Sequence, residues 1–136
     1  MRIEEEVAAK VYRMRELHED FSRGCYQEMN DNYSNHFTGK LYMPAIGEVR
    51  TFTGEEIKEG NKEAASYYKG KKIMFIYSGL QIVPQSDKQA AVSYHITHKS
   101  DGKLVNTLSL EVWEKEKDGE WRMIRWYEEK GIGRPI

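Results

Sequence analysis

Alternating apolar and polar positions dominate the second half of the chain and predict a long β-hairpin near its end. Two runs rich in β-branched and aromatic residues, 103–113 and 120–127, flank Asp118-Gly119, a dipeptide typical of two-residue hairpin turns. Such a turn fixes which residues of the two strands oppose one another. The predicted pairs are Glu111 with Trp126, Trp113 with Ile124, Ser109 with Glu128 and Leu110 with Tyr127.

This register divides the side chains of the hairpin between two faces of the sheet, and neither face is fully polar. One face is predicted to carry Thr107, Ser109, Glu111, Trp113, Ile124, Trp126 and Glu128. The other is predicted to carry Leu108, Leu110, Val112, Met123 and Tyr127, with Arg125 among them. Because both faces are partly apolar, we expect each to be covered by other parts of the protein or by a partner.

Two further strands are predicted before the hairpin, over 72–83 and 89–99, joined near Pro84-Gln-Ser-Asp87. Asp101-Gly102 reads as a second two-residue turn, which places Val92 opposite Glu111, Tyr94 opposite Ser109 and Ile96 opposite Thr107. A plain register in the first hairpin adds Phe75, Tyr77 and Gln81 to the Glu111 face, whereas a β-bulge would turn them away from it.

The first half of the chain has mainly helical periodicity. Apolar residues recur at helical spacing over 2–22, and a second short helix is predicted over 25–33. Short strands are predicted over 37–43 and 48–52, separated by a Pro-Ala-Ile-Gly turn. Thr53-Gly-Glu-Glu56 has the form of a capping box, and Gly70 stands where a helix would end. The pattern predicts an α+β fold in which helices cover one face of a curved sheet and enclose a pocket.

Length and composition fit one domain spanning 1–136. Net charge is only −1 with acids and bases interspersed, which gives no electrostatic reason to expect nucleic acid or an anionic membrane as a partner. The single cysteine, Cys25, fits a reducing compartment. No run resembles a signal peptide or approaches the roughly 20 apolar residues of a membrane span, so we expect a cytoplasmic protein. No metal-ligand spacing, glycine-rich loop or Ser-His-Asp set is visible, so neither a metal nor a cofactor is implied.

The ordered set of these features resembles the NTF2-like superfamily, in particular its SnoaL-like, ketosteroid-isomerase-like branch. The features are the helical start, Met43-Pro44 after the first strand, the Thr53-Gly-Glu-Glu-Ile57 opening of the third helix, and Asp118-Gly-Glu-Trp-Arg-Met-Ile-Arg-Trp126. The resemblance implies a cystatin-like cone, in which a curved antiparallel sheet of four long and two short strands is covered by three N-terminal helices.

The family's functional residues are kept only in part. Ketosteroid isomerases carry an Asp-Pro where this chain has Met43-Pro44, and a helical Tyr where it has a residue near Leu17, whereas their central-strand acid aligns with Glu111. Limonene-epoxide-hydrolase-like proteins carry an Arg-x-Asp and a second acid, and this chain keeps the two carboxyls as Glu111 and Glu128 without the Arg. The resemblance therefore implies a pocket with a retained acid rather than either known mechanism.

Glu111 is the main candidate for chemistry. Its predicted neighbours Trp113 and Trp126 would leave its carboxyl group poorly solvated, which favours the neutral form. A neutral carboxyl group can donate a proton or a hydrogen bond. The alternatives are a structural Glu bonded to Tyr77, Tyr94 or His98, or an exposed one. Glu128 and His98 are the other catalytic candidates, although Glu128 also reads as a solvated charge at the rim and His98 as a structural histidine. The predicted ligand-binding residues are Leu17, His18, Phe75, Tyr77, Tyr94, Ile96, Trp113, Ile124 and Trp126.

Three functions stay open at this point: a cofactor-free isomerase, dehydratase or hydrolase acting on a small apolar compound, a non-catalytic protein that binds such a ligand, and a dimerisation module with a filled cone. We also expect a homodimer formed through the face of Leu108, Leu110, Val112, Met123 and Tyr127, because that face is too apolar for water.

Overall fold

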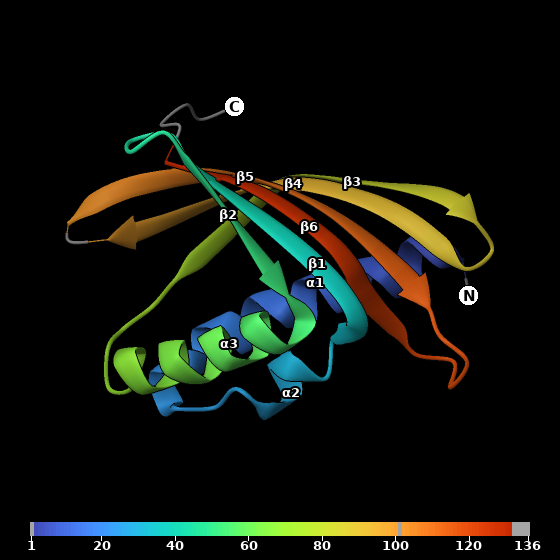
Figure 1. The fold of residues 1–136 in the computed structure, drawn as a ribbon, viewed down its shortest axis with the longest axis horizontal. Helices are drawn as coiled ribbons and strands as arrows, with labels where there is room; N and C mark the ends of the chain where they lie inside the picture. The colour runs from blue at the N-terminus through green and yellow to red at the C-terminus, as the bar shows by residue number, and fades with distance from the viewer. Residues whose placement is uncertain (1, 101, 132–136) are drawn as a thin grey trace.

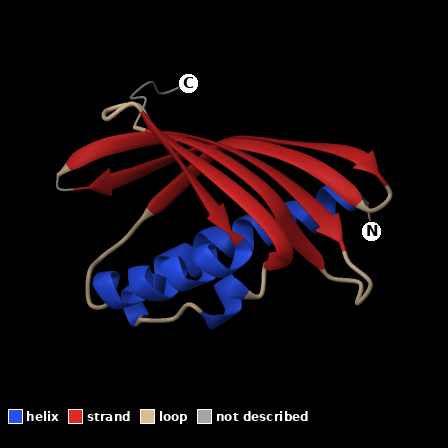
Figure 2. Cartoon of the chain, in the orientation of Figure 1, coloured by secondary structure: helices blue, strands red, loops and turns tan. Residues whose placement is uncertain are grey.

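A six-stranded sheet arches over a layer of helices in the computed structural model, which describes residues 2–100 and 102–131 (Figure 1). The helices all lie on one side of the sheet, and we call the side that they cover the inner face and the opposite side the outer face (Figure 2). This arrangement confirms the predicted α+β fold.

The first helix, α1 (Ile3–Glu19), is followed at once by a 3-10 turn, η1 (Asp20–Arg23), which together match the helix predicted over 2–22. Helix α1 buries an apolar stripe against the inner face, formed by Val7, Val11, Met14 and Leu17. Helix α2 (Gln27–Asn30) is a single turn, shorter than the helix predicted over 25–33. Tyr33 belongs to the next strand instead of to this helix, because the chain turns at Asp31 and Asn32.

Helix α3 (Gly54–Tyr68) begins with the predicted capping box. The backbone N–H of Glu56 donates to Thr53 Oγ1 at 3.1 Å, and the backbone N–H of Thr53 donates to Glu56 Oε1 at 3.0 Å. These two bonds satisfy donors that the first turn of a helix otherwise leaves free. Gly70, with a positive φ of 81°, follows the helix as expected.

The sheet has the strand order β2-β1-β6-β5-β4-β3. The strands are β1 (Tyr33–Met43), β2 (Glu48–Thr53), β3 (Phe75–Ser86), β4 (Gln89–Ser100), β5 (Lys103–Lys115) and β6 (Trp121–Lys130). Strand β1 starts earlier than predicted, and it runs parallel to β6 while every other pair is antiparallel. The sheet is therefore mixed, and β1 joins the first half of the chain to its last strand.

The register between β4 and β5 is the predicted one, with Val92 opposite Glu111, Tyr94 opposite Ser109 and Ile96 opposite Thr107. Between β5 and β6 the prediction holds for the pairs Ser109–Glu128, Leu110–Tyr127 and Glu111–Trp126.

Beyond Val112 the predicted register of β5 and β6 is wrong, because a β-bulge shifts it by one residue. Trp113 lies opposite Met123, not Ile124, and the strands are joined by a longer loop in which the N–H of Glu116 donates to the carbonyl of Glu120 at 2.9 Å. Met123 is therefore buried in the core, and Ile124 is not part of it. The sequence prediction placed Met123 on the outer face, and the bulge moves it to the inner one.

A second bulge lies in β3 after Ser78, where Gly79 adopts a positive φ of 66°. Before it, Phe75 and Tyr77 keep the predicted inner-face register, opposite His98 and Ile96. After it the alternation is reversed, so that Leu80 and Ile82 pack against the core and Gln81 is exposed. The predicted inner-face position of Gln81 is therefore wrong, because the extra residue in the bulge moves the side chains that follow it to the opposite face.

Among the described residues, no helix is long and apolar enough to cross a membrane.

Candidate functional site

Glu111 lies in the middle of β5 with its carboxyl group buried on the inner face, where the residue is only 5% exposed. The Tyr94 hydroxyl donates to Oε2 at 2.5 Å, and the Ser109 hydroxyl donates to the same oxygen at 3.3 Å. The Trp113 indole N–H donates to Oε1 at 2.9 Å. Two neighbouring strands thus hold the carboxyl in one orientation.

Burial raises the pKa of Glu111, and this effect is larger than the opposing effect of the hydrogen bonds from Tyr94, Trp113 and Ser109. None of the ion pairs formed by the described residues includes Glu111 or Glu128. The carboxyl of Glu111 is therefore surrounded by neutral donors rather than by a cation, which favours its protonated form over the form expected in water.

Three tyrosines surround this carboxyl. The rings of Tyr77 and Tyr94 are stacked with their centroids 4.5 Å apart. Burial, followed by the charge of Glu111, raises the pKa of Tyr33, Tyr77 and Tyr94, so each phenol keeps its proton at physiological pH. Of the three phenols, that of Tyr94 donates directly to Glu111, and Tyr33 and Tyr77 lie close enough for the charge of Glu111 to affect their pKa.

Glu128 lies opposite Ser109 on β6 and is half-buried. The Trp126 indole N–H donates to its Oε2 at 3.0 Å. Burial, with a smaller contribution from the charge of Glu111, raises the pKa of Glu128 to about 7, although Lys130 and the Trp126 hydrogen bond oppose the shift. This carboxyl is thus poised between its two protonation states near neutral pH.

The two histidines predicted as site residues lie together at one end of the inner face. The ring of Phe75 lies between them, 5.6 Å from the His18 ring and 5.4 Å from the His98 ring. Burial lowers the pKa of His18 to about 4, and its Nδ1 lies 3.0 Å from the carbonyl oxygen of Met14. Burial, with the nearby charge of Lys130, also lowers the pKa of His98. Both rings are therefore neutral at physiological pH.

The remaining predicted ligand-binding residues fall into two groups. Leu17, Tyr94 and Trp113 are buried in the core, whereas Tyr77, Ile96 and Trp126 are partly buried against it. Ile124 lies outside this cluster because of the bulge. Sequence reasoning missed Tyr33, because it predicted a helix at this position. The pattern of buried and exposed residues that begins at Tyr33 in β1 is too irregular to indicate a strand there.

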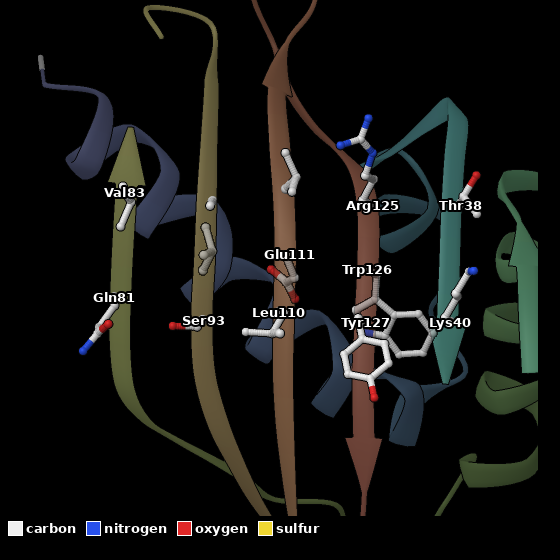
Figure 3. A pocket seen from close by; sticks show the side chains of 13 residues that line it. Thr38, Lys40, Gln81, Val83, Ser93, Leu110, Glu111, Arg125, Trp126 and Tyr127 are labelled. Carbon is white, nitrogen blue, oxygen red and sulfur yellow. The ribbon is translucent and has the colours of Figure 1, made fainter. Parts of the chain in front are cut away.

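The outer face bears a separate groove of about 780 Å³ (Figure 3). Its walls carry the side chains of Gln81, Val83, Ser93, Leu110, Arg125 and Tyr127. Backbone at Val92, Glu111 and Trp126 also borders the groove, but strand alternation directs these side chains to the inner face. The groove and the Glu111 cluster therefore lie on opposite sides of the same strands.

Among the residues that the structure describes, no group of three or more His, Cys, Asp or Glu side chains is arranged to hold a metal ion.

No protein family model and no curated protein sequence matches the chain. Solved structures do match it. An NTF-2 like protein of unknown function from Pseudomonas aeruginosa has a TM-score of 0.73 at 12% identity, over 92% of this chain and 98% of that one. A ketosteroid isomerase-like protein from Erwinia carotovora atroseptica has a TM-score of 0.61 at 17% identity, over 98% of this chain and 100% of that one.

A third similar structure is the CamKII hub homology domain of Chlamydomonas reinhardtii, with a TM-score of 0.64 at 18% identity, over 93% of this chain and 97% of that one. At these identities the similarity concerns the fold and not the activity. A domain from Nostoc punctiforme described as having a cystatin-like fold also matches, with a TM-score of 0.68 at 14% identity. The chain therefore has the NTF2-like, cystatin-like fold.

Proposed function

We propose that the protein binds a small, largely apolar molecule at the inner face of its sheet, and that Glu111 and Glu128 exchange hydrogen bonds and protons with it. The observation that carries this proposal is the presence of two carboxyl groups on adjacent strands of the inner face, each held by an indole N–H and neither paired with a cation among the described residues.

The energetics of burial argue against a purely structural role for both acids. Moving a carboxylate out of water without a cationic partner costs several kcal/mol, and an apolar residue of similar size would stabilise a core better. Strongly perturbed acids inside a protein are more common at functional sites for this reason. A filled core would gain nothing from the second carboxyl, Glu128, whose pKa burial raises to about 7.

The surroundings suggest different roles for the two acids. Glu111, with its raised pKa and fixed orientation, suits a neutral donor to a ligand oxygen. Glu128 is more accessible and has a pKa of about 7, which suits a general acid or base. Together they support a cofactor-free proton transfer, as in an isomerase, dehydratase or hydrolase, and a non-catalytic binding protein would use the same contacts without turnover.

The test is native mass spectrometry of the protein purified from its expression host, followed by titration of any retained small molecule into variants. We expect Glu111→Gln to fold and to weaken binding about tenfold or more, because an amide keeps the volume but cannot donate an ionisable proton. The matched control is Glu114→Gln on the same strand, whose side chain points to the other face. Equal affinity of wild type and Glu111→Gln would rule out the role of this residue.

A second proposal concerns the outer face, which we infer to be the surface through which two copies of the chain associate. Leu110 is 41% exposed at its centre, and the groove beside it is lined mainly by apolar atoms. Arg125 and Lys40 stand at its border and are available to pair with acids of a second copy. This proposal is compatible with the first, because the two surfaces lie on opposite faces of the sheet.

A further inference from the structure

Two buried polar atoms on the inner face have no hydrogen-bond partner among the described residues: Oγ1 of Thr107 and Nδ1 of His98. Thr107 is only 2% exposed, so ordinary solvent does not compensate its hydroxyl. Buried polar atoms in native proteins almost always have a hydrogen-bond partner. Two unpaired ones therefore point to a partner that the chain itself does not supply. Both atoms lie toward the end of the hairpin at which β4 is followed by β5.

Strand register brings a third polar group to the same place. Thr107 on β5 lies opposite Ile96 on β4 and opposite Lys130 on β6, and His98 is two residues beyond Ile96 on the same face. The hydroxyl, the imidazole and the ammonium group therefore come from three neighbouring strands. We call this set of Thr107, His98 and Lys130 the donor triplet.

The charges around the donor triplet are few. His18 is neutral and its Nδ1 is bonded to Met14, so it adds no charge. His98 is neutral as well, and its Nδ1 is free to carry the proton as a donor. Glu128 is the nearest acid along β6, and it is partly protonated near neutral pH. Beside Phe75, Glu19 accepts the Phe75 N–H at 3.0 Å and pairs with Arg15 at 3.5 Å, so these two charges offset each other and Lys130 is the cation of the donor triplet.

We propose that the donor triplet binds the carboxylate of an amphipathic organic acid whose apolar body extends along the inner face toward Tyr94 and Glu111. The inference rests on the proposed small-molecule site and specifies the class of its ligand. A carboxylate presents only acceptor oxygens, which match three donors and leave none of them unpaired. Thr107 and Glu111 are four residues apart on one strand, or about 13 Å, which sets the approximate length of the apolar body.

A groove beside the edge of the sheet gives this acid a way in. It has a volume of about 580 Å³, runs between α1 and the start of β3, and is bordered by Arg15, Lys72, Phe75 and Tyr77. Phe75 borders this groove and its ring centroid lies 5.4 Å from that of His98, so we expect the acid to reach the donor triplet past this ring. Glu19 also lines the groove and pairs with Arg15 at 3.5 Å, so Lys72 is the cation there that favours the approach of an anion.

The experiment compares two probes of the same shape, 4-phenylbutyrate and 4-phenyl-1-butanol, by isothermal titration calorimetry at pH 7.5. Wild type is expected to bind the acid about tenfold tighter than the alcohol, the size of one charge-assisted hydrogen bond. Thr107→Val and Lys130→Gln should each bring that ratio close to one. Lys99→Gln is the matched control, because Lys99 is exposed and alternates to the outer face beside His98, and it should leave the ratio unchanged.

A second readout separates ligand binding from a structural role of the hydroxyl. Because Thr107 Oγ1 has no partner in the free protein, Thr107→Val should leave the melting temperature unchanged or raise it. A lower melting temperature would mean that the hydroxyl has a structural partner, and it would overturn the inference. So would an acid that fails to bind at millimolar concentration. Equal binding of acid and alcohol, unaffected by the variants, would overturn the carboxylate subsite and leave the proposed function standing.

Discussion

Two carboxyl groups lie on neighbouring strands of the same face, yet their surroundings differ. Glu111 accepts three hydrogen bonds and is almost fully buried, whereas Glu128 accepts one and is half-buried beside Lys130. Burial is the largest influence on the pKa of both residues, and it acts upward in each case. The difference lies in exposure: Glu128 is less buried than Glu111, which is why the proposal assigns proton exchange to Glu128.

The raised pKa of Glu128 makes a testable prediction about stability. Its pKa rises from 4.5 to about 7 on folding, so the folded protein binds more protons than the unfolded chain between these values. Stability is then lost as pH rises through this window, by up to about 3 kcal/mol. Replacing the residue by Gln removes the titration and keeps an acceptor for the Trp126 indole.

We therefore expect Glu128→Gln to match wild type near pH 4.5 and to exceed it in free energy of unfolding by up to about 3 kcal/mol at pH 8. Urea denaturation at both pH values measures this difference. Glu129→Gln, next in sequence but directed to the other face, is the control for removing a carboxylate from β6. Parallel stability profiles for wild type and Glu128→Gln would contradict the assigned pKa shift.

At the scale of the elements, local sequence signals predict where helices and turns form. They do not show where one extra residue in a strand shifts the pairing of that strand. The capping box at Thr53 and Glu56 is a local signal that predicts α3, and the β4–β5 register is the one predicted from the Asp101-Gly102 signal, although Asp101 itself lies outside the described residues. The bulges at Ser78 and beyond Val112 leave no comparable mark, because the same residues fit either register until the packing against the helices is known.

The bulges change the position of few of the predicted site residues. Trp113 reaches the inner face as predicted because the extra residue of that bulge lies in the partner strand β6, and Phe75 and Tyr77 do so because they precede the bulge in β3. Ile124 and Gln81 do not, since they lie at or after the shift. The parallel pairing of β1 with β6 was also not predictable, because it joins segments far apart in the sequence.

Gly79 tests how the bulge in β3 is maintained, and Gly60 in α3 provides a comparison. Gly79 has a φ of 66°, a backbone conformation that residues with a side chain rarely adopt. A Cβ there would meet only His95 Cδ2, at an ordinary 3.6 Å, so the expected strain comes from the backbone and not from a steric clash. Gly79→Ala should lower the free energy of unfolding by about 1–2 kcal/mol. Gly60 in α3 has open space around it, and Gly60→Ala should raise that free energy by up to about 1 kcal/mol.

Chemical denaturation of the two glycine variants beside wild type provides the measurement, and the opposite signs make each variant the control for the other. Destabilisation of both would point to a general effect of alanine at these positions. No loss of stability in Gly79→Ala would mean that the bulge tolerates a side chain and that its position in β3 is not fixed by this glycine.

At the scale of the whole molecule, the helices cover the inner face, and none of the helices that the structure describes lies on the outer face (Figure 2). Among the apolar residues that line the outer-face groove, Val83 is 59% exposed and Leu110 is 41% exposed. Met123, predicted for this face, lies in the core instead, so the apolar surface is centred on Leu108, Leu110, Val112 and Tyr127. A sheet face of this kind is stabilised when a second copy covers it.

Leu110→Glu therefore tests the proposed dimer. A carboxylate at the centre of an apolar interface would have to be buried without a partner, which costs several kcal/mol and is counted twice in a symmetric dimer. We expect wild type to run as a dimer in light scattering at micromolar concentration and Leu110→Glu to run as a monomer with an unchanged helical and β signal in circular dichroism.

Leu104→Glu, at a position 72% exposed near the start of the same strand, provides the control for an added charge. A wild-type monomer at this concentration would refute the proposed interface, and the apolar groove would then have to be explained by a partner of a different kind.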